Sequence, residues 1–565
     1  MRDERSEEDA PSNFIADEID ADLKAGRYTR PICTRFPPEP NGFMHIGHAK
    51  AASVGHGLAE RFDGLFNLRM DDTNPSKEEQ RFVDAMIHDL EWFLGRGLDG
   101  RVYHASDYFP RLYECAEKLI EKGLAYVESL TTEEIRDYRG DFHTPGRPSP
   151  YRDRPVDENL RLFREMRDGK HEPGTLVLRA KIDPAASNMN MRDPIVYRVM
   201  HQPHHRAGDW KIYPLYDFAH PLSDAFEGVT HSTCGKEFAN HRPLYDWFLE
   251  ALDFKEPPRQ IEFAEISVSR TILSKRHMKV LVEDGHVSGW DDPRMPTMSG
   301  MRRRGCPASA IREFCSALGV SGASPGMVDR ALMDHFVREA LNKTSSRVMG
   351  VPRPLKVVID NYPEGQTDDF KAANLPGDDS RGKRTVSFGH EIYIDRSDFM
   401  EEPPPKYHRL APGREVRLRS AYIIKCTEVI KDPETGEVTE LRATYDPDSK
   451  WVPGGKVRKV KGTIQWVNAA QAVRVQLRMY DELFTAEVDG YDGSAPITDY
   501  LEPNSLEVLD DAVVEPSIVG TEPGTVVQFE RVGYFCVDPD STDERLVLNR
   551  TVNLRDNRFR RIFKK

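Results

Sequence analysis

The sequence contains little cysteine and no long apolar segment. Its seven cysteines are scattered through 565 residues, and none forms a Cys-x-x-Cys pair, which argues against a zinc knuckle or a disulfide framework. We therefore expect a reducing, cytoplasmic setting and no structural metal site. No run of 18 or more apolar residues occurs, so no membrane-spanning helix is expected. Residues 2–22 are acidic and lack the apolar core of a secretory signal.

Basic residues are also fewer than acidic ones: the sequence has 79 Lys and Arg and 93 Asp and Glu, which gives a net charge of −14. Such a balance argues against general attraction to nucleic acid, although binding depends on local potential rather than on the sum. Basic residues gather at 302–304, between 450 and 461, and at 550–565. Taken alone, each of these stretches is more typical of a solvated face than of a nucleic-acid site.

The length predicts several domains, since 565 residues exceed what one hydrophobic core supports. Strand candidates at 32–36 and 66–70, with helical spacing at 82–94, indicate a βαβ unit and a parallel sheet with a ligand crevice at the strand ends. After Pro352 the pattern changes to short strands separated by turn residues, which favours β-barrels. These strand candidates lie at 357–359, 391–394, 415–419, 464–467 and 526–529.

The most informative stretch runs from Arg35 to His48, where prolines and Asn-Gly predict a tight loop that leads into a helix. A helix N-terminus offers free N–H groups and the positive end of a dipole, which suits phosphate. Gly47 has no Cβ, so a nucleotide could approach the backbone closely. His45 and His48 can donate hydrogen bonds to phosphoryl oxygens. Alone, the pattern could equally be a capped helix with two incidental histidines.

A second motif, Ile272-Leu273-Ser274-Lys275-Arg276, decides between these readings. With the first motif it resembles the paired HIGH and KMSKS signatures of the class I aminoacyl-tRNA synthetases. Further matches are similar to the glutaminyl/glutamyl subclass, and in particular to its bacterial glutaminyl enzymes, over about residues 13–555. These further matches lie at 36–42, 68–75, 290–297 and 300–305.

The resemblance implies a multidomain fold: an α/β Rossmann-type catalytic domain with an α+β insertion for the tRNA acceptor stem, a helical connecting domain and two C-terminal β-barrels. The implied division is a lead at 1–28, the catalytic domain at 29–105 and 211–265, the insertion at 106–210, the connecting domain with the Ser-Lys-Arg loop at 266–345, the proximal barrel at 346–383 and 461–555, the distal, anticodon-binding barrel at 384–460, and a basic tail at 556–565.

The implied activity attaches L-glutamine to tRNA(Gln) through a glutaminyl-adenylate, with ATP and Mg²⁺. The substrate carboxylate is itself the nucleophile, so the enzyme must position two anions and stabilise charge on phosphorus. The resemblance assigns this work to His45, Gly47, His48, Ser274 and Lys275. It extends the ATP site to Glu39, Pro40, Asn41, Ile46, Ala49, Lys50, Ala51, Gly235, Glu265, Ile266 and Leu273.

For the amino acid, the resemblance implies that Asp71 binds the α-ammonium group and that Arg35 lines the pocket. Glutamine and glutamate are nearly isosteric, so the pocket must distinguish NH₂ from O⁻. Tyr216 matches the position that receives the amide, Gln260 fits the glutaminyl pattern, and Cys234 stands where glutamyl enzymes place arginine. Without the family, Asp71 would be a turn cap, Tyr216 a core aromatic and Cys234 a small buried hydrophobe.

For tRNA, the resemblance places Phe142 at the tip of a hairpin that opens the first acceptor pair, where leucine is usual. Asn240 replaces an aspartate that reads the acceptor stem. Bases splayed from single-stranded RNA are read by donors such as Arg and Gln. The implied anticodon-reading positions are Arg347, Lys406, which replaces a glutamine, Arg409, Arg419, Gln528 and Arg531.

We expect a glutamine-specific enzyme that is a monomer. Three alternatives to it are weighed. A glutamyl or relaxed Gln/Glu synthetase would favour arginine at position 234. A catalytically inactive RNA-binding paralogue is disfavoured by the intact His45, Gly47, His48 and Lys275. A truncated paralogue that charges a modified tRNA base would lack the β-rich half that this chain has.

Overall fold

The computed structural model describes residues 13–76, 78–323, 326–452 and 458–555, which form two compact units. The first unit runs to Ser267 and adds Arg312–Val328, and the second comprises Val268–Ile311 and the chain from Asp329 onward. The connecting domain predicted at 266–345 is therefore shared between the two units. Most of the predicted lead, at 1–12, and the basic tail at 556–565 lie outside the described residues.

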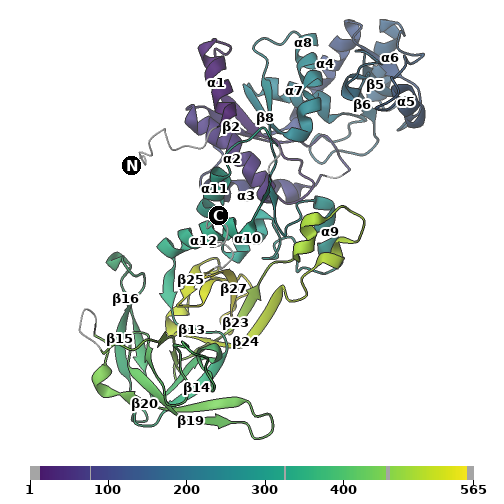
Figure 1. Cartoon of the computed structure of the whole chain (residues 1–565). Helices are drawn as coiled ribbons and strands as arrows, with labels where there is room; N and C mark the ends of the chain where they lie inside the picture. Colours follow the sequence, from purple (N-terminus) through teal and green to yellow (C-terminus); the bar gives the residue numbers. More distant parts are fainter. Residues whose placement is uncertain (1–12, 77, 324–325, 453–457, 556–565) are drawn as a thin grey trace. The chain divides into compact units, whose positions relative to one another are not determined.

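The first unit is built on parallel strands (Figure 1). The sheet order β1-β2-β3 places β2 on one side of β1, and on the other side Thr230 N donates to the Cys33 carbonyl at 2.8 Å. Thr230 leads directly into β8, which pairs in parallel with β9. The carboxyl end of β1 is thus a point where the strand order changes direction, the usual place for a ligand crevice. The strands are β1 (Cys33–Phe36), β2 (Leu65–Met70), β3 (Val102–His104), β8 (His231–Gly235) and β9 (Arg259–Phe263).

Among the helices of the first unit, α3 (Gln80–Leu94) follows the helical spacing predicted at 82–94. The Asn13 side chain caps α1, and the Thr131 and Glu134 side chains form a capping box on α5. Gly95, at φ +73°, ends α3 in the left-handed conformation that favours glycine. The helices are α1 (Phe14–Lys24), α2 (Ile46–Arg61), α3 (Gln80–Leu94), α4 (Phe109–Glu121), α5 (Thr132–Arg139), α6 (Val156–Arg167), α7 (Tyr216–Phe226) and α8 (Arg242–Ala251).

The insertion has its own antiparallel sheet, in the order β4-β5-β6-β7, next to α4, α5 and α6. Its last strand corrects the predicted boundary at residue 210. Tyr197 of β6 is in register with Pro214 of β7, so backbone pairing carries the insertion on to residue 214. The strands are β4 (Ala125–Glu128), β5 (Val177–Ala180), β6 (Ile195–Val199) and β7 (Ile212–Pro214).

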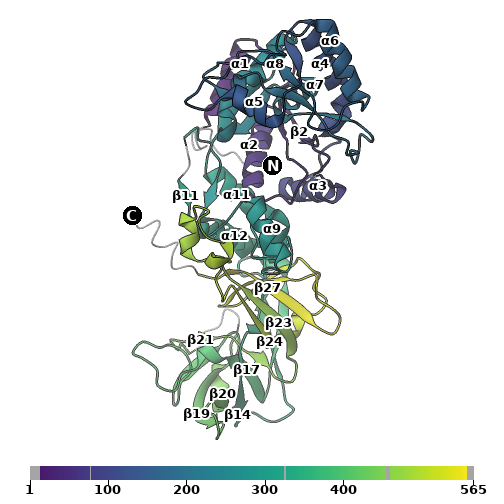
Figure 2. The same cartoon turned by 90° about the vertical axis from the view of Figure 1, so that its right-hand side faces the viewer.

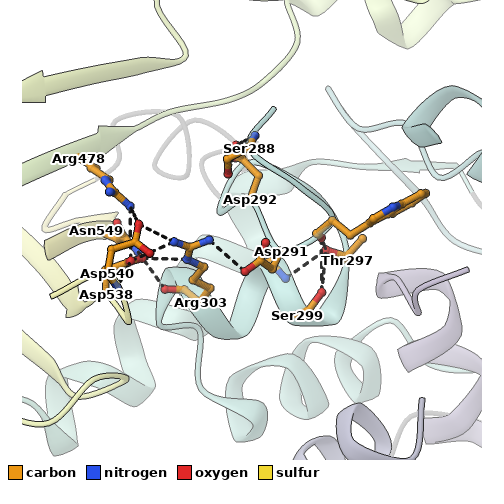
Figure 3. Close-up of polar contacts among 12 residues, drawn as sticks. Ser288, Asp291, Asp292, Thr297, Ser299, Arg303, Arg478, Asp538, Asp540 and Asn549 are labelled. Carbon is orange, nitrogen blue, oxygen red and sulfur yellow. Dashed lines mark hydrogen bonds and ion pairs between the residues drawn. The ribbon is translucent and has the colours of Figure 1, made fainter. Parts of the chain in front are cut away.

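In the second unit, short helices attach to a β-sheet through buried charges. Arg303 of α10 donates to Asp538 through Nε and Nη2, and also to Asp540 and Asp291 (Figure 3). Arg478 of β23 reaches the same two barrel carboxylates. This network holds α10 against the proximal sheet. The helices are α9 (Lys275–Glu283), α10 (Met298–Arg304), α11 (Ala308–Ala317), which crosses the unit boundary, and α12 (Arg330–Thr344).

The rest of the second unit consists of two seven-stranded sheets (Figure 2). Their orders are β12-β25-β26-β27-β23-β24-β13 and β21-β18-β19-β20-β14-β17-β22. In each sheet the first and last strands follow one another in the chain, so both sheets are barrel-like, as predicted. The proximal strands are β12 (Ser346–Val348), β13 (Gly350–Val351), β23 (Val473–Tyr480), β24 (Leu506–Val514), β25 (Val526–Phe529), β26 (Gly533–Val537) and β27 (Leu546–Asn553).

The division between the barrels differs from the predicted one. Lys356 of β14 is in register with Tyr393 of β17 and with Glu440 of β20, so residues 354–359 belong to the distal sheet. Residues 463–468 join it as well, and β15 pairs with β16 as a separate hairpin. The strands are β14 (Pro354–Ile359), β15 (Asp368–Ala373), β16 (Lys383–Phe388), β17 (Glu391–Asp395), β18 (Glu415–Leu418), β19 (Ile423–Lys431), β20 (Val438–Asp446), β21 (Thr463–Ile464) and β22 (Val467–Asn468).

Candidate active site and RNA-contacting residues

The loop after β1 delivers two histidines to the start of α2. His45 is the N-cap residue, and its Nδ1 accepts from the Gly47 amide at 3.1 Å. The His45 amide donates to Nδ1 of His48 at 3.0 Å, so the two imidazoles replace the usual capping-box side chains. Because both Nδ1 atoms accept, each neutral ring carries its proton on Nε2. The helix start therefore presents Nε2–H donors together with its dipole, an arrangement suited to an anion.

Lys50, one turn further along α2, does not point toward the start of the helix. Its Nζ donates to the Cys315 carbonyl at 2.7 Å and to the Gly319 carbonyl at 2.5 Å, and it is buried. Burial lowers the pKa of this lysine. The ammonium group therefore closes the C-terminal end of α11, and the Lys50 side chain makes no contribution at the helix start.

Asp71 follows β2 directly and is 4% exposed. The pKa of its carboxyl is raised to about 8, mainly by burial; Arg69 opposes this rise, and the carboxylates of Glu39, Glu78 and Asp72 add to it. The Asp71 side chain accepts no hydrogen bond within the described chain. A buried acid without a partner at the end of a parallel strand suits a cationic ligand. The neighbouring Asp72 instead caps the next segment by accepting from the Ser106 amide and hydroxyl.

Arg35 belongs to a buried charge cluster that the sequence analysis did not include. Its Nε lies 3.1 Å from Oδ1 of Asp224, and Nη1 of Arg69 lies 2.5 Å from the same oxygen. Oε2 of Glu227 lies 3.4 Å from Arg69. Burial opposes ionisation of Asp224, but the two guanidinium groups hold its pKa well below its usual range. Two arginines and two carboxylates thus compensate one another inside the protein.

His220 lies between the two arginines, with Nε2 2.8 Å from Arg35 Nη2 and Nδ1 3.0 Å from Arg69 Nη2. Burial lowers the pKa of His220 well below its usual range, so the ring is neutral. Tyr216 stacks on this ring at 4.9 Å, one helical turn earlier. The residues at 216, 220 and 224 occupy one face of α7, a spacing that could have identified Asp224 from the sequence.

The pocket side of this cluster is formed by uncharged groups. Cys234 Sγ lies 3.4 Å from Arg35 Nη2, at the end of β8. Gln260 Nε2 donates to the Phe238 carbonyl at 3.2 Å and to Glu262 at 2.9 Å. Burial, then Cys234 and Asp71, raise the pKa of Tyr216 well above its ordinary value, which keeps its hydroxyl neutral. The structure therefore brings Arg35, Asp71, Tyr216 and Cys234 together.

Two predicted ATP-site residues lie at the end of β8 and just after β9. Gly235 begins a short 3₁₀ turn, and a Cβ there would collide with the Glu237 carboxylate. Glu265 is exposed as a whole residue, but its carboxyl is partly covered. This partial burial, together with the neighbouring Glu237, raises the pKa of Glu265 to about 7. This part of the site is acidic.

The Ser-Lys-Arg motif belongs to the second unit. Ser274 is the N-cap of α9, and its carbonyl accepts from the His277 and Met278 amides. Lys275 is the first residue of the helix. Just upstream, the Arg270 amide donates to Asp489 at 2.5 Å, and its guanidinium pairs with Glu482. The start of α9 is thus anchored to the segment that follows β23.

Phe142 is 88% exposed at the tip of a tight loop. The Asp141 carboxylate accepts from the His143 and Thr144 amides at 2.8 Å, and Arg192 Nη1 donates to three carbonyls of the loop. An apolar ring is therefore presented to solvent on a fixed support. Asn240 is exposed, and its carbonyl accepts from the side chains of Asn188 and Asn190.

The predicted anticodon positions form two groups on the barrels. Arg347 is in register with Gln528, and its guanidinium is held by Ser345 and Asn342. Arg409 and Arg531 share the Asp398 carboxylate, at 3.2 and 3.8 Å. Two further positions complete the set: Arg419 pairs with Glu530 at 2.8 Å, and Lys406 is exposed.

One cluster of the described residues, Glu78 with His204 and His205, has the residue types of a metal site. However, His204 Nδ1 accepts from the Arg206 and Ala207 amides, and Nε2 lies 2.8 Å from the Asp72 carbonyl. Both ring nitrogens of His204 are therefore used in contacts with backbone groups, and the cluster holds the loop around residues 204–207 in place. Within the described ranges, no helix is long and apolar enough to cross a membrane.

Family models match nearly the whole chain. The catalytic domain of the class I tRNA synthetases (E and Q) matches residues 31–343, and their anticodon-binding domains match 345–446 and 463–538. The chain belongs to this family, the class I aminoacyl-tRNA synthetases of the E and Q group. Among curated proteins it is 53% identical to the glutamine–tRNA ligase of Nitrobacter winogradskyi, over 98% of each chain. The corresponding ligase of Clostridium kluyveri is 51% identical over 97% of this chain and 98% of its own.

Proposed function

We propose that the protein is a glutamine–tRNA ligase that uses ATP with Mg²⁺ to form glutaminyl-adenylate and then esterifies the 3′ end of tRNA(Gln). The observation that carries this proposal is the match to glutamine–tRNA ligases over almost the full length of both chains. The seven thiols, all buried and unbridged, support a reducing cytoplasm as its setting.

In the first step, the glutamine carboxylate attacks the α-phosphorus of ATP and pyrophosphate leaves. His45 and His48 donate through Nε2–H to phosphate oxygens, and the α2 dipole stabilises the charge that develops on them. The resemblance assigns Lys275 and Ser274, at the start of α9, to contacts with ATP phosphates as well. No side chain needs to act as a general base, because the attacking carboxylate is already ionised. Mg²⁺ enters with the ATP phosphates.

Asp71 holds the α-ammonium group of glutamine and thereby fixes the direction of the carboxylate. The ligand cation restores the ionised form of a carboxyl whose pKa is raised to about 8 by burial. The Tyr216 hydroxyl accepts one amide hydrogen of the side chain. In this geometry, the binding energy of both ends of the amino acid is used to orient the nucleophile.

Selection against glutamate rests on charge. Arg35 and Arg69 are neutralised by Asp224 and Glu227, and His220 is uncharged, so the cluster beneath the pocket has no surplus cation for a γ-carboxylate. Cys234 adds no charge where an arginine would. A buried carboxylate without a partner costs several kcal/mol, whereas an amide needs only hydrogen bonds. This arrangement favours glutamine over the glutamyl or relaxed alternative.

Parallel aminoacylation of total tRNA from the source cell with labelled glutamine and labelled glutamate tests the proposal. Charging with glutamine alone is expected. Comparable charging with glutamate would instead favour the relaxed enzyme. Absence of charging with either amino acid would point to the inactive RNA-binding paralogue.

A further inference from the structure

A cavity of about 280 Å³ lies within the second unit, and the roles assigned above use none of its lining arginines. It is bounded by α10, α12, the end of β23 and β27. Its lining contains five arginines and three carboxylates, an excess of positive charge in a chain whose overall charge is −14. The charged lining residues are Arg304, Arg330, Asp334, Arg338, Asp481, Glu482, Arg550 and Arg555.

Arg304, the last residue of α10, is 8% exposed and has an unsatisfied donor. Its Nε donates to the Thr551 carbonyl at 2.9 Å. Its Nη1 is fully buried and has no hydrogen-bond partner in the described part of the chain. A buried charged donor left unsatisfied costs free energy, and such groups are rarely left without a partner. The Arg304 guanidinium is therefore incomplete without a ligand or ordered water in the cavity.

The nearby carboxylates do not supply this partner. Asp481 lies 3.2 Å from Arg550 Nη2, and Glu482 pairs with Arg270. Asp334 lines the cavity between Arg330 and Arg338, which lie one helical turn from it on either side along α12. In the described part of the chain no ion pair joins Arg304, Arg330 or Arg338 to a carboxylate, although Asp334 and Glu482 lie near enough to attract Arg330.

Arg330 shows the same excess of positive charge. Within the described ranges its guanidinium takes part in no ion pair, and burial, then the neighbouring Arg304, lower the pKa of Arg330. Mutual repulsion between the buried Arg304 guanidinium and the half-buried Arg330 is relieved when an anion lies between them. Guanidinium groups match the geometry of phosphate oxygens through paired N–H donors.

We propose that this cavity is a phosphate-binding site formed by Arg304, Arg330 and Arg338. The site is independent of the proposed aminoacylation and does not require the His45 or Lys275 motifs. Its ligand is a phosphate group, either free inorganic phosphate or a phosphate of an RNA backbone. Asp334 stays beside the arginines and limits the charge of the ligand that the site accepts.

Binding of inorganic phosphate to the full-length protein tests the proposal. The titration is followed by calorimetry at constant ionic strength with chloride as the replaced anion. Arg330→Gln and Arg338→Gln are each expected to weaken saturable phosphate binding by at least about tenfold, the loss of a charge-assisted hydrogen bond. The matched control is Arg474→Gln, whose side chain is 70% exposed and pairs with Asp511 on the same sheet. It is expected to leave binding unchanged.

If phosphate instead bound at the start of α2, none of these variants would change its affinity. Unchanged affinity in both Arg330→Gln and Arg338→Gln would therefore overturn the proposal, as would the absence of saturable binding in the parent protein. Because Arg304→Gln removes a buried bond to Thr551, its folding is checked by circular dichroism. If it folds, it must lose phosphate binding as well.

A second arm distinguishes the two sources of phosphate. If the ligand is an RNA phosphate, tRNA displaces inorganic phosphate, and Arg330→Gln lowers the salt slope of tRNA binding by about one. If the ligand is free phosphate, tRNA affinity and salt slope stay those of the parent, while phosphate binding is lost in the variant. Loss of tRNA affinity with retained phosphate binding would contradict the proposed site.

Discussion

The Nε atom of Arg35 lies 3.1 Å from Oδ1 of Asp224, and neither side chain is exposed. The same carboxylate holds Arg69 and accepts from the Tyr245 hydroxyl at 2.9 Å. Asp224 therefore sets the position of Arg35 beneath Cys234 and also neutralises it. Under the proposed function, one buried carboxylate would then serve both structural support and amino-acid selection.

Asp224→Asn is expected to destabilise the protein by about 3–5 kcal/mol, because two guanidinium groups lose their compensating charge in a buried site. Urea unfolding measures the loss. The matched control is Asp511→Asn, whose exposed pair with Arg474 is worth less than about 1 kcal/mol. If Asp224→Asn proves as stable as this control, the buried cluster does not need the negative charge of Asp224. In variants that fold, the selectivity for glutamine over glutamate is expected to fall.

Glutamine binding is expected to depend on pH through Asp71. Burial raises the pKa of this carboxyl to about 8, and the α-ammonium group requires its ionised form. Affinity should rise by up to about tenfold per pH unit up to pH 8 and then level off. Calorimetry between pH 6 and 9 measures this profile, and Asp71→Asn should make it flat as well as weak. A flat profile in the parent protein would contradict the role of Asp71.

The same group affects stability with the opposite sign. The free folded protein keeps the Asp71 proton up to about pH 8, whereas the unfolded chain releases it near pH 4. The folded state then binds more protons, so the contribution of Asp71 to stability falls as pH rises from about 4 to 8. Saturating glutamine should reduce this fall, because it stabilises the ionised form. Thermal unfolding with and without glutamine measures the difference.

Cys234→Arg is expected to weaken the use of glutamine and to favour glutamate. The new guanidinium would lie beside Arg35, whose Nη2 is 3.4 Å from the present sulfur, and Asp224 could not neutralise both. A substrate γ-carboxylate would then supply the missing charge. The measurement is kcat/KM for each amino acid, with Cys234→Ser as the uncharged control. An unchanged Gln/Glu ratio would show that position 234 does not determine amino-acid choice.

Sequence patterns predicted the elements that carry strong periodicity, such as α3 and the strands β1 and β2. They placed the barrel boundary wrongly, because β14 pairs with β17 and β20, and such distant register is not encoded in local spacing. At the site, His45 and Asp71 were predicted from their motifs, and their roles stay predictions. Asp224 was missed: its spacing from Tyr216 and His220 places it on one face of α7, but its pairing with Arg35 and Arg69 joins residues that are distant in the chain.

Lys275→Ala is expected to reduce aminoacylation by orders of magnitude while leaving tRNA affinity unchanged, since the role proposed for its ammonium group is to stabilise ATP phosphates. The control is Lys279→Ala, one turn along α9, where the side chain is 63% exposed and faces Glu283 at 3.5 Å. Pyrophosphate exchange separates the adenylation step from transfer. Near-normal exchange in Lys275→Ala would remove the phosphate-contact role.

Phe142→Ala is expected to slow transfer to tRNA without slowing pyrophosphate exchange, because an exposed ring on a loop held by Arg192 can stack against an opened acceptor pair. Phe142→Leu should retain most of the rate by keeping an apolar tip. The informative substrate is a tRNA whose first acceptor pair is mismatched, since it needs no opening. This substrate should restore the rate of the alanine variant. If the alanine variant is equally slow on both tRNAs, Phe142 acts on something other than the opening of that pair.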